Sequence, residues 1–292
     1  MFMKGIRHLL LALACSNLFL PAAGFAEVTL YTDNQVTRNV LVNSDLPSGS
    51  LISDSYRYVL SHLDRFPDIY FENQIRAEKL LTPDTAACQI MKVRTEEREK
   101  HYLFSEATDV YLSHKLYVQQ EYTATIRDNY LNKEGEVASV SAIFQDAKDR
   151  VLLLITGHSY GQYLDAEITH IDNSQRYYLG ASDPYDLYFK MFNQERGQFA
   201  LLIPSALKNS DTPLQHYTSF ALANNPPYIT GHIMCSKHPE SVQFIKDVNA
   251  VLYEYYRSGT FEKYAMRYFP DEELGTLRHF IHAQVQRLQP GN

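Results

Sequence analysis

Strand-like and helix-like hydrophobic patterns alternate along this chain of 292 residues. Short apolar runs bounded by polar and turn residues predict strands at 28–31, 69–73, 86–93, 151–156 and 228–235. Apolar positions at helical spacing predict helices at 50–63, 137–147, 162–168, 183–193, 239–258 and 260–269. Extended segments rich in β-forming residues are expected at 110–119 and 217–223. Such alternation is typical of an α/β architecture.

The first residues combine a basic start, an apolar stretch at 9–20 and small residues ending at Ala26. This is the pattern of a cleavable secretory signal peptide, so we expect residues 1–26 to be removed during export to the periplasm. One alternative is a membrane anchor, for which the apolar stretch is short and contains Asn17. Another is a lipoprotein signal at Cys15.

The remaining chain is long enough for one large domain or for two smaller lobes with their own cores. Loss of Lys4 and Arg7 with the leader would change the formal charge from −7 to −9. No basic run opposes this acidic balance. The charge therefore argues against a nucleic-acid partner.

Two cysteines, Cys88 and Cys235, remain after removal of the leader. Export to an oxidising compartment predicts that they form a disulfide. The alternatives are a catalytic thiol or half of a metal site, but neither cysteine has a Cys-x-x-Cys partner or an adjacent His at ligand spacing. His279 and His282 have no acidic residue between them and indicate a helix surface. No metal site is expected.

The sequence Gly157-His158-Ser159-Tyr160-Gly161 matches the G-x-S-x-G elbow of α/β-hydrolases and lies between a predicted strand and a predicted helix. A serine hydrolase would use Ser159 as nucleophile, with Asp211 and His232 as partners in the right chain order. However, no His-Gly dipeptide is present to form an oxyanion loop. The same turn suits ligand binding, because the first N–H groups of a helix are unpaired.

Residues 88–107, CQIMKVRTEEREKHYLFSEA, place a Thr-x-x-Arg helix start, Thr95 to Arg98, after a strand and before Phe104-Ser105. This stretch resembles the signature of the family 3 extracellular solute-binding proteins, which have the type 2 periplasmic binding fold. The segment 150–165 and the Ser236-Lys237 that ends the predicted strand 228–235 are similar to later parts of the same family. The resemblance covers nearly the whole mature chain.

The resemblance implies an α/β fold of two lobes joined by two hinge crossovers. Lobe one would comprise residues 27–115 and 225–292, and lobe two residues 118–222. The hinges are expected near 116–119 and 219–223, where the chain is extended. In this fold the strands that hold the two cysteines are neighbours in lobe one.

The resemblance also implies a function. The protein would capture a small, anionic or polar ligand between its lobes for an ABC-type transporter, as a monomer without a cofactor or enzymatic activity. A stand-alone ligand sensor, passing its state to a membrane partner, is the alternative.

Ligand contacts are expected on both lobes. Arg98 would hold an anionic group, supported by Thr95, which can cap the helix, and by Tyr31. Across from them, the ligand-facing wall of lobe two would be formed by Thr156, Ser159 and Tyr160. The alternatives are that Arg98 is a surface residue and that Ser159 only caps its helix.

One departure bears on the ligand. Amino-acid binders of the family carry a Gly-x-x-Asp and a further Asp in lobe two, the latter holding the ligand's amino group. Here the counterpart reads Gly197-Gln198-Phe199-Ala200. The sequence thus argues against an α-amino-acid ligand.

Overall fold

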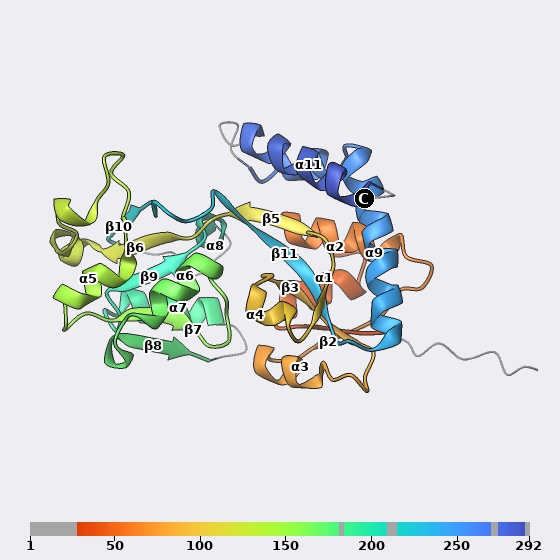
Figure 1. Cartoon of the computed structure of the whole chain (residues 1–292), viewed down its shortest axis with the longest axis horizontal. Coiled ribbons are helices and arrows are strands. Elements are labelled where there is room, and N and C mark those ends of the chain that lie inside the picture. Colours follow the sequence, from red (N-terminus) through yellow and green to blue (C-terminus); the bar gives the residue numbers. More distant parts are fainter. Residues whose placement is uncertain (1–27, 181–183, 209–214, 270–273, 290–292) are drawn as a thin grey trace, which may run out of the picture.

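Two separate sheets organise the computed structural model, which describes residues 28–180, 184–208, 215–269 and 274–289 (Figure 1). The predicted signal peptide, residues 1–26, lies outside this described part. The first sheet has the strand order β2-β1-β3-β11-β4, with β5 also paired to β11. Its strands are β1 (Thr29–Thr32), β2 (Asp68–Phe71), β3 (Ala87–Lys92), β4 (Leu103–Phe104), β5 (Asp109–Leu112) and β11 (Tyr228–Cys235).

Helices of the first lobe surround this sheet, and several of them, including α2 and α9, bury its apolar face. The helices are α1 (Gln35–Val42), α2 (Leu51–Ser61), α3 (Gln74–Leu80), α4 (Glu96–Glu99), α9 (Pro239–Arg257), α10 (Thr260–Ala265) and α11 (Leu274–Leu288). Residues of α2 and α9, such as Tyr56 and Val248, pack in one core with Leu30 and Ile233 of the sheet. Burial of such side chains stabilises the lobe by about 1.5–3 kcal/mol each.

The second sheet has the order β10-β6-β9-β7-β8, with β7 and β8 parallel. Its strands are β6 (Lys115–Gln119), β7 (Leu152–Ile155), β8 (Arg176–Leu179), β9 (Phe199–Leu202) and β10 (Tyr217–Phe220). The α-helices of this lobe are α5 (Val140–Asp146), α6 (Gln162–Thr169), α7 (Pro184–Asn193) and α8 (Pro204–Lys208). Three short 3₁₀ helices complete the described part of this lobe: η1 (Gln120–Thr125), η2 (Asp128–Tyr130) and η3 (Asn173–Gln175).

Two crossovers connect the lobes. The first is the short break between β5 and β6, at Ser113 and His114, and the second follows β10 and enters β11. Asn225, in the second crossover, donates to Ser113 Oγ at 3.0 Å and to the carbonyl oxygen of His114 at 3.2 Å. This side chain ties the two crossovers together.

The structure corrects the extended segment predicted at 110–119. That segment is two strands, because β5 pairs with β11 in the first sheet and β6 pairs with β9 and β10 in the second. Residues 116–119, predicted as a hinge, lie inside β6, and part of the hinge predicted at 219–223 lies inside β10. The chain passes between the lobes a few residues away from each predicted position.

Most predicted elements are present with small shifts at their ends. The helix predicted at 137–147 begins at Val140, because Ser139 caps it by accepting from Ala142 N at 3.2 Å. The helix predicted at 260–269 ends at Ala265. The patterns did not predict several elements of the structure, among them α1, α3, β8, β9 and α8.

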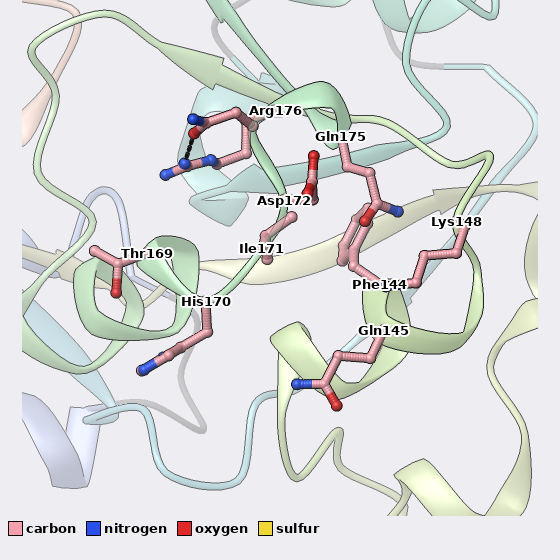
Figure 2. Close-up of a pocket in the computed structure, with 10 residues that line it drawn as sticks. Phe144, Gln145, Lys148, Thr169, His170, Ile171, Asp172, Gln175 and Arg176 are labelled. Carbon is pink, nitrogen blue, oxygen red and sulfur yellow. Dashed lines mark hydrogen bonds between the residues drawn. The ribbon is translucent and has the colours of Figure 1, made fainter.

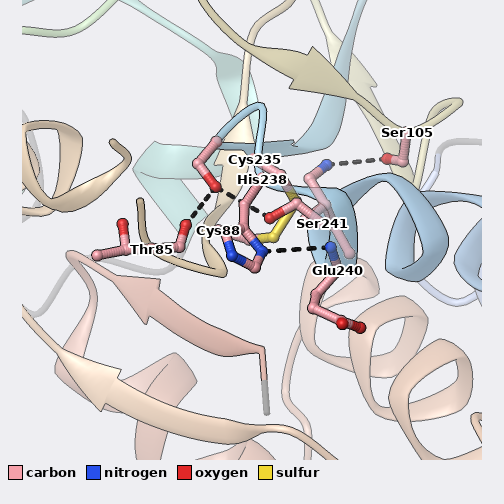
Figure 3. The surroundings of a disulfide bond; sticks show 9 residues. Thr85, Cys88, Ser105, Cys235, His238, Glu240 and Ser241 are labelled. Carbon is pink, nitrogen blue, oxygen red and sulfur yellow. Dashed lines mark hydrogen bonds between the residues drawn. A yellow bond between two sulfur atoms is a disulfide. The ribbon is translucent and has the colours of Figure 1, made fainter. Parts of the chain in front are cut away.

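Cys88 and Cys235 form a disulfide between neighbouring strands (Figure 3). They are register partners on β3 and β11, with Cα atoms 4.0 Å apart, and both are fully buried. Nearby, Ser236 donates to the carbonyl oxygen of Thr85 at 2.5 Å, which holds the end of β11 against the start of β3. The predicted pairing of the two cysteines is confirmed.

Asp109 begins β5, where the chain leaves the first lobe, and is fully buried. Its Oδ2 accepts from Thr108 Oγ1 at 3.4 Å, whereas its Oδ1 has no hydrogen-bond partner among the described residues. Gly231 lies opposite on β11, where a Cβ atom would come within 2.3 Å of Asp109 Oδ1. Burial raises the pKa of Asp109 to about 7.

We expect the double substitution Cys88→Ala and Cys235→Ala to lower the free energy of unfolding. The disulfide closes a loop with a sequence separation of 147 residues. In the chain-entropy model such a loop stabilises by about 5 kcal/mol, because it restricts the unfolded chain. Urea unfolding of oxidised wild type, reduced wild type and the double variant measures the difference. Equal midpoints for all three proteins would contradict the expectation.

Asp109 should make stability fall as the pH rises from about 4 to about 7. Its pKa is 3.8 when unperturbed and about 7 in the folded protein, so over this window the folded state holds a proton that the unfolded chain releases. His158 and His232, with pKa values lowered to about 4 by burial, act in the opposite direction.

The Asp109→Asn variant separates these opposing effects. Urea unfolding from pH 4 to pH 8 should show a more steeply rising stability in Asp109→Asn than in wild type, because the variant keeps the histidines and loses the carboxyl. Parallel pH profiles would show that Asp109 titrates normally.

Candidate functional site

Polar groups from both lobes meet where β3 and β7 end. Arg98, in α4, donates to the carbonyl oxygen of Gly157 in the second lobe at 3.2 Å. Gln74, at the start of α3, donates to the same oxygen. Figure 1 shows α4 on the side of the first lobe that faces the second. We use the term lobe junction for Asp33, Lys92, Arg98, Gly157 and His158.

The local sequence positions Arg98. Thr95 Oγ1 accepts from Arg98 N at 3.3 Å and so caps α4, as the sequence predicted. The guanidinium also donates to the carbonyl oxygen of Val93 at 3.0 Å. Among the residues that the structure describes, no carboxylate lies within ion-pair distance of Arg98. Its charge is therefore met by neutral acceptors.

Lys92 is a second cation at the junction, and only 3% of it is exposed. Its ammonium lies 3.5 Å from Asp33 Oδ2, which follows β1. Burial lowers the pKa of Lys92, while the nearby Asp33 acts in the opposite direction. Burying an ammonium is costly unless it is paired, so the contact with Asp33 is needed to keep Lys92 charged.

Two imidazoles, the partly buried His158 and the buried His114, lie together at this end of the junction. His158 follows Gly157 and contacts the ring of His114 from the first crossover, with ring centroids 5.9 Å apart. Burial, and then the charge of Lys92, lowers the pKa of His158 to about 4. Burial likewise holds the pKa of His114 well below its usual value. Both rings are neutral at physiological pH.

The serine of the G-x-S-x-G motif is engaged inside the second lobe. Ser159 Oγ donates to Asp165 Oδ2 at 2.5 Å and accepts from Gly161 N at 3.3 Å. The other Asp165 oxygen accepts from Tyr160 N at 2.8 Å. The Ser159 hydroxyl thus donates to a carboxylate and not to the histidine that a Ser–His pair would require.

The other predicted ligand contacts occupy different positions. Tyr160 is buried, and its hydroxyl accepts from Ile155 N at 2.8 Å. Thr156 follows β7, and its backbone N–H donates to the carbonyl oxygen of Leu179 at 2.9 Å. Tyr31 lies on β1 next to Tyr70 of β2, with ring centroids 6.4 Å apart. Of the predicted contacts, the structure brings Arg98 to the turn that precedes Ser159. Tyr31 packs beside Tyr70 on a face of the first sheet.

Sequence reasoning did not identify Lys92, Asp33, Gln74 or His158 as site residues. One local signal was present, because Lys92 is a charged residue at the end of a largely apolar strand. Its orientation depends on pairing with β11, which no local pattern reveals.

Two surface hollows lie away from the junction. The first, of about 350 Å³, is formed by residues near the ends of α5 and α6 and the start of β8, including Lys148, His170 and Arg176 (Figure 2). Arg176 is level with Leu152 at the start of β7, whereas the junction follows the other end of that strand. The second hollow lies among α9, α10 and α11.

Within the described ranges, no three His, Cys, Asp or Glu side chains are grouped so that they could hold a metal ion. In the same ranges, every helix is too short or too polar to cross a membrane.

Comparison with known proteins rests on structure. No protein-family model and no curated protein matches the sequence. A structure from work on glutathione import through GshT and the cystine ABC importer TcyBC of Streptococcus mutans matches with a TM-score of 0.56 and 17% identity, over 85% of this chain and 98% of that one.

Two further structures are similar. A histidine kinase sensor domain with similarity to periplasmic binding proteins has a TM-score of 0.59 and 9% identity, over 84% of this chain and 96% of that one. An ABC uptake transporter substrate-binding protein from Streptococcus pneumoniae with bound histidine has a TM-score of 0.55 and 14% identity, over 83% and 92%. This chain therefore has the two-lobed fold of type 2 periplasmic binding proteins, which confirms the predicted fold class.

We expect Ser159 to behave as a structural hydroxyl. Ser159→Ala should lower the free energy of unfolding by about 1 kcal/mol, because Asp165 loses a hydrogen bond. A fluorophosphonate probe should leave wild type unlabelled, since no histidine in the described part of the chain bonds the hydroxyl, which donates to Asp165 instead. Thermal unfolding and mass spectrometry measure both, with Ser61→Ala as the control for an exposed serine. Labelling of Ser159 would instead support the alternative that the protein is a serine hydrolase.

Proposed function

We propose that this protein is an exported solute-binding protein that captures a small anionic ligand between its lobes for an ABC-type transporter. The observation that carries the proposal is Arg98, a cation at the lobe junction that bonds carbonyl oxygens and has no ion-pair partner among the described residues. In this fold, solutes bind between the lobes, so an unneutralised guanidinium there is a natural anion site.

A ligand oxyanion would bind Arg98 more strongly than the present carbonyl acceptors do. Hydrogen bonds between charged groups are worth about 1.5–3 kcal/mol, against about 1 kcal/mol for neutral ones. The ligand would displace the Gly157 carbonyl or share the guanidinium with it. Because Gly157 belongs to the other lobe, a ligand that touches both lobes would favour the closed arrangement.

The remaining assignments belong to the same proposal. Export through a signal peptide, residues 1–26, would place a monomer in the periplasm. Lobe limits near 27–115, 118–222 and 225–292 remain a prediction. Tyr31, Thr95, Thr156, Ser159 and Tyr160 also remain predicted ligand contacts, although the Ser159 and Tyr160 hydroxyls bond within the second lobe here.

A stand-alone ligand sensor is the second candidate, and the similarity to a histidine kinase sensor domain favours it. Both candidates use the same junction, so ligand binding does not separate them. A permease gene beside this one would support transport, and a signalling gene would support sensing. Catalysis is not part of either candidate.

Replacement of Arg98 tests the proposal. In a thermal-shift screen of mono-, di- and tricarboxylates, we expect at least one to raise the melting temperature of wild type, since a ligand at a hundred times its Kd stabilises by about 2.7 kcal/mol. Arg98→Ala should weaken the binding of that ligand by about tenfold to a hundredfold, because a charge-assisted pair is lost.

Arg76→Ala is the matched control, because its side chain is 72% exposed and pairs with Glu72 on the surface. It should bind like wild type. Equal affinity of Arg98→Ala and wild type for the ligand found in the screen would refute the proposed role of Arg98.

A further inference from the structure

Lys92 is aimed at the lobe junction by a break in the register of β3. Gln89 pairs with Met234 and Lys92 with His232, so β3 has two residues between these pairs where β11 has one. The extra residue is a β-bulge at Met91, whose φ of 58° is in the left-handed region that non-glycine residues avoid. Met91 N donates to the Tyr56 hydroxyl at 2.8 Å, which braces the bulge.

Without the bulge, Lys92 would point into the apolar core. Cys88 and Ile90 both pack there, and strict alternation along a strand would place Lys92 on the same face. The bulge moves Lys92 onto the opposite face, where it reaches Asp33. Left-handed backbone at a non-glycine residue costs about 1–3 kcal/mol, and such strain is concentrated at functional sites.

The acids around the junction already have partners. Asp33 pairs with Lys92, and Asp165 accepts from Ser159 and from Tyr160 N. The other two pairs are Glu96 with Gln162 and Glu78 with Tyr102. A ligand ammonium at the junction would therefore have to share one of these carboxylates with the partner it already has.

We propose that Lys92 makes the site selective for a small carboxylate, or a similar oxyanion, that carries no ammonium group. This inference rests on the proposed function, because it assumes that the ligand binds at the lobe junction beside Arg98. Lys92 acts in two ways: it occupies Asp33, the acid that an ammonium would need, and its own charge repels an ammonium nearby. Arg98 then holds the ligand's oxyanion.

Matched ligand pairs that differ by one ammonium group test the proposal. Succinate against aspartate and glutarate against glutamate are titrated calorimetrically into the mature protein. Wild type should bind the member without the ammonium more tightly by about tenfold or more. Lys92→Met frees Asp33 and removes the repelling charge, so it should reduce this preference to about threefold or less.

Two variants control for nonspecific effects. Lys92→Arg keeps the charge and should keep the preference. Lys100→Met removes an exposed lysine that pairs with Glu97 and should also keep it. Circular dichroism and thermal unfolding confirm that each variant is folded. If Lys92→Met does not fold, the wild-type preference and the affinities of Lys92→Arg decide the question.

The outcomes distinguish this inference from the proposed function. Binding that depends on Arg98 but shows no preference in wild type, or the same preference in Lys92→Met, would overturn the role of Lys92 and leave the solute-binding function intact. Tighter binding of aspartate or glutamate by wild type would also overturn it. If no carboxylate or amino acid binds wild type, the proposed function and this inference fail together.

Discussion

The antiparallel pairing of β3 with β11 is the interaction on which the rest of the structure depends. It places a strand that arrives from the second lobe between β3 and β4, which completes the first sheet. The same pairing brings Cys88 beside Cys235 and fixes where the second crossover enters the lobe. Its irregular register produces the bulge that turns the buried Lys92 toward Asp33 at the junction. The β3–β11 pairing therefore determines both the core of the first lobe and the position of Lys92 at the lobe junction.

The lobe junction is held by contacts of moderate strength. Arg98 and Gln74 reach a carbonyl oxygen of the other lobe, and Gln162 donates to Glu96 at 3.3 Å. Neutral acceptors and amides make weaker bonds than opposed charges. His158 adds no charge of its own, because its pKa is lowered to about 4. Among the residues that the structure describes, no ion pair joins the two lobes, so these contacts can separate without breaking one.

The local hydrophobic pattern was enough to predict where most strands and helices lie, but not which strands pair with each other. The runs at 28–31 and 228–235 identified β1 and β11 almost to the residue, because apolar runs between turn residues are a local signal. The segment 110–119 looked continuous, since only pairing to two different sheets divides it. Thr95 was recognised as a cap for the same local reason. Lys92 and its bulge depend on the distant β11 and could not be read from β3.

The insertion of β11 between β3 and β4 also determines the order in which the chain can fold. The paired cysteines are 147 residues apart, whereas all five strands of the second sheet lie in one continuous stretch of chain, from β6 to β10. The second lobe can thus assemble during synthesis, before β11 is available to pair between β3 and β4. Contacts between distant segments form slowly, and open strand edges are prone to aggregation. The apolar face of the first sheet is the part of the nascent chain that most needs protection.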